Sequence, residues 1–407
     1  MLRTLFTIIV LCCCSLIGAQ TNPNNPWQEI DTLLAHGHYA TAYEKARQQY
    51  ETSKRKGSSH DMLKAVYKQQ MAAAAYQENH IEHGIGAYKA LIPHLQGADK
   101  SMAHLLLAAL VEDKRSHYEA ALAEREALKA IRTEDYDLLV EGDTLGLRLR
   151  PTLYDVVMHA IIPSNIYLND AKIKNLLHDQ RDLLYGTAEE FVSLCLPSDT
   201  LSYELWQLGK LQELTRHHRN TADAAVRAHV DHRRIEALGY IQHYSNADVL
   251  QEAYIEGLER IAESYRGNAT EQVMFLFKLA DYHKPTIYEH SDEEAIGREL
   301  KRAARMERYV ERIREVAPDS EWAKAAEALY RQVTHPYLKL QGHKTLLPGR
   351  EGSITITLRG AGSIAYRIVP RHAGETTDNF NFKEVIGRKS VGKAYEIVHP
   401  EYPNPYV

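Results

Sequence analysis

Histidine is abundant in this sequence, and its spacing raises the question of a metal site. The chain carries 21 histidines, and the densest group comprises His217, His218, His229, His232 and Glu236. Residues three and four apart share a helix face, so the last three of these would lie together. The tight His-Glu-x-x-His motif of many zinc enzymes is missing. We therefore expect solvated or locally bonded histidines and no metal ligand. The alternative is a metal-dependent hydrolase that binds zinc or iron through His229 and His232.

A nucleophilic cysteine is the second chemistry to consider, because a thiolate beside a base can attack a carbonyl group. Cys195 lies in the apolar segment 191–197, which predicts a buried, inert thiol. No histidine has a spacing that supports a catalytic pair with it. Gly360 and Gly362 are not followed by a helix and a lysine, so they predict no phosphate-binding loop. We expect no catalytic residue and no cofactor-binding residue.

Charge argues against two classes of partner. The formal net charge is −5, which argues against nucleic acid or anionic lipid as the main partner. The arginine-rich segment 298–314 contains glutamates at helical i,i+3 and i,i+4 spacing, namely Glu299, Glu307 and Glu311. This pattern predicts a solvated helix face that neutralises itself.

The first residues are typical of a secretory signal peptide. Residues 1–19 contain one arginine, an apolar run and the small residues Gly18 and Ala19. Lipidation at Cys12, Cys13 or Cys14 is an alternative, and only such an anchor would place the protein on a membrane. After cleavage Cys195 is the one remaining cysteine, so no internal disulfide is expected. This suits the periplasm or cell envelope of a bacterium.

Helical periodicity covers residues 20–132 and continues over residues 133–334. The first apolar pattern breaks at Gly37, and Tyr39 and Ala42 follow it. Glycine, an aromatic and a small residue at such a turn are typical of tetratricopeptide-like helical hairpins. Residues 133–151 predict a loop or extended connector, and Ser320 predicts the N-cap of the last helix. The expected class is mainly α, a helical-hairpin array.

From Pro336 the hydrophobic period changes from helical to strand-like. Ile354, Ile356 and Leu358 alternate with polar residues, and a further strand is expected at residues 394–398, including Tyr395 and Ile397. We expect residues 335–407 to form a small, incomplete antiparallel β-sandwich, which makes the chain α+β overall. The edges of these two strands are the predicted docking places for a partner protein.

The junction between helices and strands contains a set of packing and capping motifs in the segments 309–320, 325–329, 336–340 and 347–349, and related segments lie at 27–39 and 151–155. Together these segments resemble a known family, the large bacterial alpha-2-macroglobulin-family envelope proteins. It implies a signal peptide, a helical-hairpin region and the start of the first macroglobulin-like β-domain. Members that trap proteases use a Cys-Gly-Glu-Gln thioester and a bait region far downstream. Cys195 is followed by Leu196 and Pro197, and the motif occurs nowhere in the sequence.

The function expected from these observations is interaction or scaffolding at the bacterial cell envelope, without enzymatic activity. The partner would be a protein, with the oligomeric state left open. We expect a truncated or split member of the family, or a scaffold derived from it. A peptide- or glycan-binding helical surface is the alternative, because the chain contains 25 tyrosines.

Overall fold

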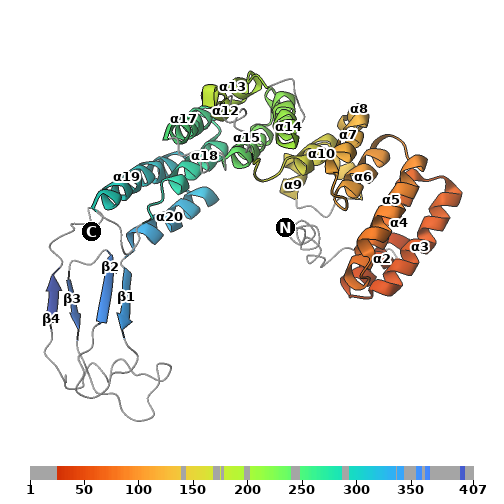
Figure 1. Ribbon diagram of the computed structural model, residues 1–407, viewed down its shortest axis with the longest axis horizontal. Coiled ribbons are helices and arrows are strands. Elements are labelled where there is room, and N and C mark those ends of the chain that lie inside the picture. Colours follow the sequence, from red (N-terminus) through yellow and green to blue (C-terminus); the bar gives the residue numbers. More distant parts are fainter. Residues whose placement is uncertain are drawn as a thin grey trace, which may run out of the picture. The chain divides into compact units, whose positions relative to one another are not determined.

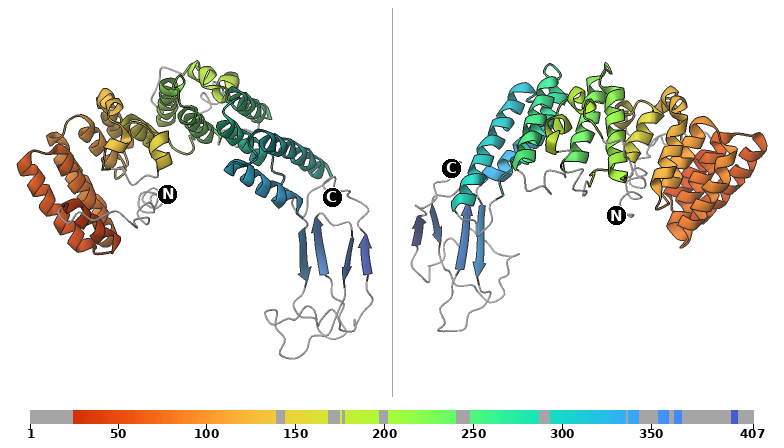
Figure 2. Two further views of the ribbon diagram at one scale, coloured as in Figure 1. Left: turned by 180° about the vertical axis from the view of Figure 1, so that it is seen from behind. Right: turned by 45° about the horizontal axis from the view of Figure 1, so that its top comes forward.

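The computed structural model describes residues 25–138, 144–167, 175, 178–196, 202–239, 248–286 and 293–335, together with four strands. The expected signal peptide, with Cys12, Cys13 and Cys14, lies outside these residues. The chain divides into two compact units, Met1–Glu271 and Gln272–Val407. This boundary falls inside the expected 133–334 array. The described part of the chain is mainly helical (Figures 1 and 2), which confirms the expected dominance of helices.

The first unit opens with four consecutive helices, α2 (Pro26–Ala35), α3 (Tyr39–Lys56), α4 (Ser59–Tyr76) and α5 (His80–Leu91). Each packs against the next along the chain. The predicted break at Gly37 is confirmed, and its φ of 77° is a left-handed conformation that glycine adopts without strain. Ala42 and Ala46 are fully buried on α3. Small side chains there let neighbouring helices approach closely.

The next group of helices is shorter. It contains α6 (Gly97–Ala108), α7 (Lys114–Ala121), α8 (Arg125–Ala130), α9 (Thr144–Leu149) and α10 (Leu153–Ile161). The predicted loop at 133–151 is therefore wrong in part, because a 3₁₀ turn and α9 lie within it. An isolated antiparallel bridge between Arg132 and Thr152 joins its two ends. Thr152 and Asp155 form a capping box that starts α10.

The first unit continues with α12 (Arg181–Tyr185), α13 (Ala188–Val192), α14 (Tyr203–His218), α15 (Ala224–Leu238) and α17 (Asp248–Ser264). Leucines of α14 form much of the local core, and Leu208, Leu211 and Leu214 are fully buried. Gly257 of α17 lies directly against the backbone carbonyl of Tyr185. A Cβ atom there would collide with that oxygen, so glycine is required for α12 and α17 to pack.

The second unit contains most of α18 (Ala269–Tyr282), and α19 (Glu293–Val316) and α20 (Glu321–Thr334). The arginine-rich segment 298–314 lies within α19. Ser320 is the N-cap of α20, because its side chain accepts a hydrogen bond from the backbone N–H of Ala323 at 3.0 Å. That prediction is confirmed. Tyr309, Val310 and Ile313 of α19 are buried where the two helices pack together.

Four short strands follow the last helix: β1 (Tyr337–Gly342), β2 (Ile354–Arg359), β3 (Ser363–Tyr366) and β4 (Tyr395–Val398). They form two antiparallel pairs, β1 with β2 and β3 with β4. Leu340 is opposite Ile356, and Ile364 is opposite Ile397. The expected strand at 394–398 begins one residue later than the pattern indicated.

A histidine on α4 ties this helix to distant parts of the chain. The Nδ1 atom of His60 lies 3.1 Å from the carboxylate of Asp99, and Nε2 lies 2.5 Å from that of Asp137. Lys64 also contacts Asp137 at 2.5 Å, and the hydroxyl of Tyr136 donates to Asp99 at 2.9 Å. The hydrogen bond with Asp99 raises the pKa of His60 to about 9, against an opposing effect of burial, and Asp137 adds to the rise.

The stability of the protein should therefore fall in mildly alkaline solution. The folded pKa of His60, about 9, exceeds its ordinary value of 6.5, so its stabilising effect is complete below pH 6.5 and is lost as pH rises through 9. Because about a third of the ring is exposed, we expect a loss of only about 1–2 kcal/mol. Urea unfolding from pH 6 to 10 measures it.

The matched variants are His60→Gln and, as control, His94→Gln at an exposed position. His60→Gln should be less stable than the unmodified protein at pH 6. Its free energy of unfolding should then decrease less between pH 6 and pH 10. An alkaline decline of equal size in all three proteins would contradict the assignment to His60.

Candidate functional site

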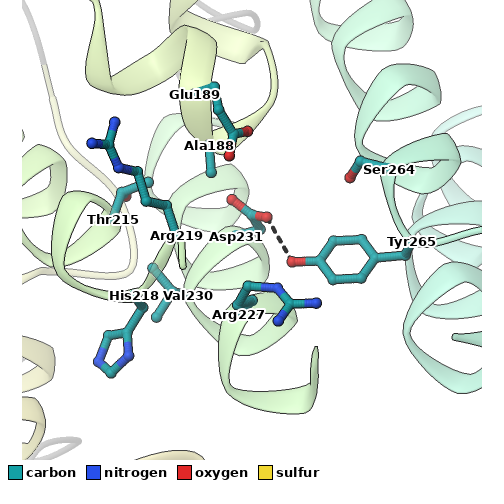
Figure 3. A pocket seen from close by; sticks show the side chains of 10 residues that line it. All are labelled: Ala188, Glu189, Thr215, His218, Arg219, Arg227, Val230, Asp231, Ser264 and Tyr265. Carbon is teal, nitrogen blue, oxygen red and sulfur yellow. Dashed lines mark hydrogen bonds between the residues drawn. The ribbon is translucent and has the colours of Figure 1, made fainter. Parts of the chain in front are cut away.

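A small polar pocket lies within the first unit, between α13, α14, α15 and α17 (Figure 3). Its volume is about 110 Å³, enough for several water molecules or one small polar group. Charged and hydroxyl groups dominate the lining, which consists of Ala188, Glu189, Thr215, His218, Arg219, Arg227, Val230, Asp231, Ser264 and Tyr265. The pocket is thus suited to polar contacts, with charges of both signs around it.

One side of the pocket is a buried ionic network. The hydroxyl of Tyr265 donates to Asp231 at 2.8 Å, drawn as the dashed line in Figure 3. The other carboxylate oxygen of Asp231 lies 3.0 Å from the guanidinium of Arg234, a fully buried side chain. That guanidinium also stands 4.9 Å over the ring of Phe191. Burial and Asp231 raise the pKa of Tyr265 far above its ordinary value, so the hydroxyl remains a hydrogen-bond donor.

His218, another lining residue, forms a buried pair with an aspartate outside the pocket. The Nε2 atom of His218, at the end of α14, lies 2.5 Å from Oδ1 of Asp155 on α10. Both side chains are almost completely buried. Burial raises the pKa of Asp155, but hydrogen bonds from His218 and Thr152 outweigh it and hold the pKa below its usual range. Asp155 is therefore ionised at neutral pH.

The histidine group picked out in the sequence is divided in space. In the described part of the chain, the groups close enough to share a metal ion are Asp155, His217 and His218. His229 packs instead against His159, with ring centroids 4.8 Å apart. His232 lies 3.6 Å from Glu236. The described residues therefore contain no metal-binding cluster made of His229, His232 and Glu236, although the sequence predicts that these residues lie together.

His159 is buried and His229 is half-buried, and both are uncharged at neutral pH. Desolvation lowers the pKa of His229 to about 4, and nearby Arg150, His232 and Arg233 lower it further, against a rise from Glu236. His159 is lowered more strongly, also mainly by burial. Helical spacing alone could not indicate this, because the partner histidine comes from α10, seventy residues earlier in the chain.

The prediction of a buried Cys195 is wrong, because its side chain is exposed. The apolar segment leaves α13 in a turn, and Leu194 takes the buried position instead. The backbone of Cys195 is fixed by Gln180, whose amide oxygen and nitrogen lie 2.9 and 3.1 Å from its N–H and C=O. An apolar run indicated a core segment but did not show which side chain of a turn points outward.

Other sequence-based expectations have mixed outcomes. Of the glutamates predicted to pair within α19, Glu299 contacts Arg302 at 3.3 Å. Glu307 accepts a hydrogen bond from Tyr330 of α20 at 3.0 Å. Arg298 also pairs within the helix, with Glu294 at 2.6 Å. The predicted docking residues lie on β2 (Ile354, Ile356, Leu358) and β4 (Tyr395, Ile397). Their side chains lie outside the described part of the structure, so docking there stays a prediction.

Sequence reasoning missed Asp155, Asp231 and Tyr265, which organise the site. Asp155 had one usable signal, since Thr152-x-x-Asp155 is a capping-box pattern. Asp231 and Tyr265 had none, because an aspartate inside a helix and a tyrosine after one are ordinary residues. Only the packing of α15 beside α17 brings the two together.

Comparison with known proteins adds no assignment. The chain matches no family model, no curated protein and no solved structure. None of the helices described is both long and apolar enough to cross a membrane. Arguments about function therefore rest on the contacts within the chain.

Replacing Tyr265 with phenylalanine should destabilise the first unit. The change removes the hydrogen bond to Asp231 while it keeps the buried ring, so a buried carboxylate loses one of its partners. We expect the free energy of unfolding to fall by about 1–3 kcal/mol. Urea denaturation followed by circular dichroism measures it. Tyr39→Phe, at an exposed position, is the control and should change stability by less than about 0.5 kcal/mol. Equal stability of both variants would contradict a structural role for the network.

Proposed function

We propose that this protein is an exported, non-enzymatic interaction or scaffold protein of the bacterial cell envelope. The observation that carries the proposal is the succession of helices that pack against their neighbours, as α2 to α5 do in the first unit and α19 with α20 in the second. Successive helical hairpins offer long surfaces for protein partners rather than one deep cleft. The export and envelope parts rest on the leader sequence and on cysteine usage.

We further propose that the strands belong to a macroglobulin-like β-domain with an antiparallel sandwich fold. The support comes from the order of elements at the junction. The Ser320-capped helix α20 ends at Thr334, and β1 begins at Tyr337. Two antiparallel pairs then follow. This order agrees with the resemblance to the alpha-2-macroglobulin family, and membership of that family is part of the proposal.

The polar pocket favours a structural role over catalysis. His218 has both ring nitrogens engaged, with Asp155 at 2.5 Å and with the Thr221 hydroxyl at 3.2 Å. Asp231 is likewise held by Tyr265 and Arg234. A general base needs a free lone pair directed at its substrate. Groups engaged in this way instead fix the helices that carry them.

A peptide- or glycan-binding surface rich in tyrosine receives less support. Many of the described tyrosines are buried between helices, namely Tyr88, Tyr118, Tyr136, Tyr154, Tyr185, Tyr254, Tyr265 and Tyr309. Tyr39, Tyr76 and Tyr167 are exposed. Packing between helices therefore accounts for much of the tyrosine content, and we do not prefer this alternative.

Site-specific photo-crosslinking tests the proposed interaction. A photoreactive phenylalanine analogue is placed at Ile356 of β2 or Ile397 of β4 in the full-length protein, expressed with its leader in a bacterial host. We expect export to the periplasm and discrete, light-dependent adducts with an envelope protein, because strand edges are suited to β-augmentation. Gel electrophoresis and mass spectrometry detect the adducts.

The control places the same analogue at Tyr76, an exposed residue of α4. Adducts from Tyr76 with none from either strand would exclude docking at the strand edges. Retention of the full protein in the cytoplasm would contradict the envelope assignment.

A further inference from the structure

Three potential metal ligands meet where the start of α10 approaches the end of α14. Asp155 belongs to α10, and His217 and His218 are the last two residues of α14. One ligand atom from each lies within 4.8 Å of the other two. Asp155 and His218 are buried, whereas His217 is exposed. The cluster is thus anchored in the protein on one side and open to solvent on the other.

Hydrogen bonds to residues outside the cluster engage one polar atom of Asp155 and one of His218. The other polar atom of each side chain is directed into the cluster. The Oδ2 atom of Asp155 accepts hydrogen bonds from the N–H and hydroxyl of Thr152, at 2.9 and 2.8 Å, which leaves Oδ1 facing His218. The Nδ1 atom of His218 contacts the Thr221 hydroxyl at 3.2 Å, which leaves Nε2 facing Asp155. Metal ligands in proteins are oriented by such second contacts, and histidine ligands in particular bind through one nitrogen and donate through the other.

The exposed ligand of the cluster, His217, is held in place by aromatic packing. Its ring packs edge-on against Tyr154, with centroids 5.0 Å apart, which restricts its orientation.

We propose that Asp155, His217 and His218 bind one divalent zinc ion. Two imidazole nitrogens and one carboxylate oxygen form a ligand set that zinc favours, and water would complete a tetrahedral site. Ligand atoms around tetrahedral zinc are separated by about 3.3 Å. The contact between Asp155 and His218, at 2.5 Å, must therefore open slightly, and His217 must move inward. Both changes are within the range of side-chain rotation.

The simpler interpretation is a buried ion pair without metal. It explains the contact between Asp155 and His218, but it gives His217 no role. The two interpretations differ in what happens when His217 is removed, since an exposed neighbour contributes little to a buried ion pair. The proposed zinc site also differs from the alternative considered from the sequence, in which His229 and His232 bind the metal. His229 lies near Arg150 and Arg233, whose charges oppose a bound cation.

Zinc titration of the full-length protein tests the proposal. The protein is stripped with chelator, dialysed and titrated with zinc chloride by calorimetry at pH 7.5, and elemental analysis gives the stoichiometry. We expect one zinc ion per chain, and a thermal midpoint that rises with zinc concentration because the metal binds the folded state. Substitution by cobalt should give the visible absorption typical of a tetrahedral site.

The decisive variant is His217→Ala, and the matched control is His232→Ala on α15. Circular dichroism verifies that both fold. His217→Ala should bind zinc at least about tenfold more weakly and lose the thermal shift, whereas the control should behave like the unmodified protein. Absence of zinc binding in the unmodified protein would overturn the proposal, as would undiminished binding by His217→Ala. An equal loss of zinc binding in both variants would also overturn the proposal, because His232 of α15 would then matter as much as the proposed ligand His217. The test does not depend on the proposed envelope function.

Discussion

The described first unit depends on one buried carboxylate, that of Asp155. It completes the capping box that starts α10, and it holds His218 at the end of α14. An ionised group with 1% of its surface exposed is tolerated only when hydrogen bonds replace its lost water. Because those hydrogen bonds come from two helices, the carboxylate fixes the end of one against the start of the other. The proposed metal ligands lie at this junction, and His218 also lines the polar pocket.

A second buried charge is compensated in the same unit by a different route. Arg234 is fully buried and relies on Asp231, on its own helix, and on the face of Phe191 from α13. Tyr265 then uses the remaining oxygen of Asp231. Breaking such a pair is costly because it leaves a charge without a partner in a low-dielectric interior. These contacts add specificity to helix packing, which apolar side chains alone define less sharply.

How far the sequence predicted the structure depended on whether the signal was local. Gly37 and Ser320 were identified correctly because a left-handed turn and an N-cap depend on one or two residues. The loop at 133–151 was partly wrong, since α9 is only six residues long and too short to show periodicity. Cys195 was misplaced because an apolar window does not reveal which side chains a turn exposes. The contact between Asp155 and His218 could not be predicted, because the two residues are sixty-three positions apart in the chain.

By itself, the sequence determined the helical character, the break at Gly37 and the N-cap at Ser320. All of these follow from backbone propensity and from the spacing of residues close together in the chain. Only the tertiary structure decided which polar residues meet. It joined Asp155 to His218, Asp231 to Tyr265 and His159 to His229. The reason is physical, because burying a charge requires a partner, and that partner is selected by helix packing across distances that no local pattern records.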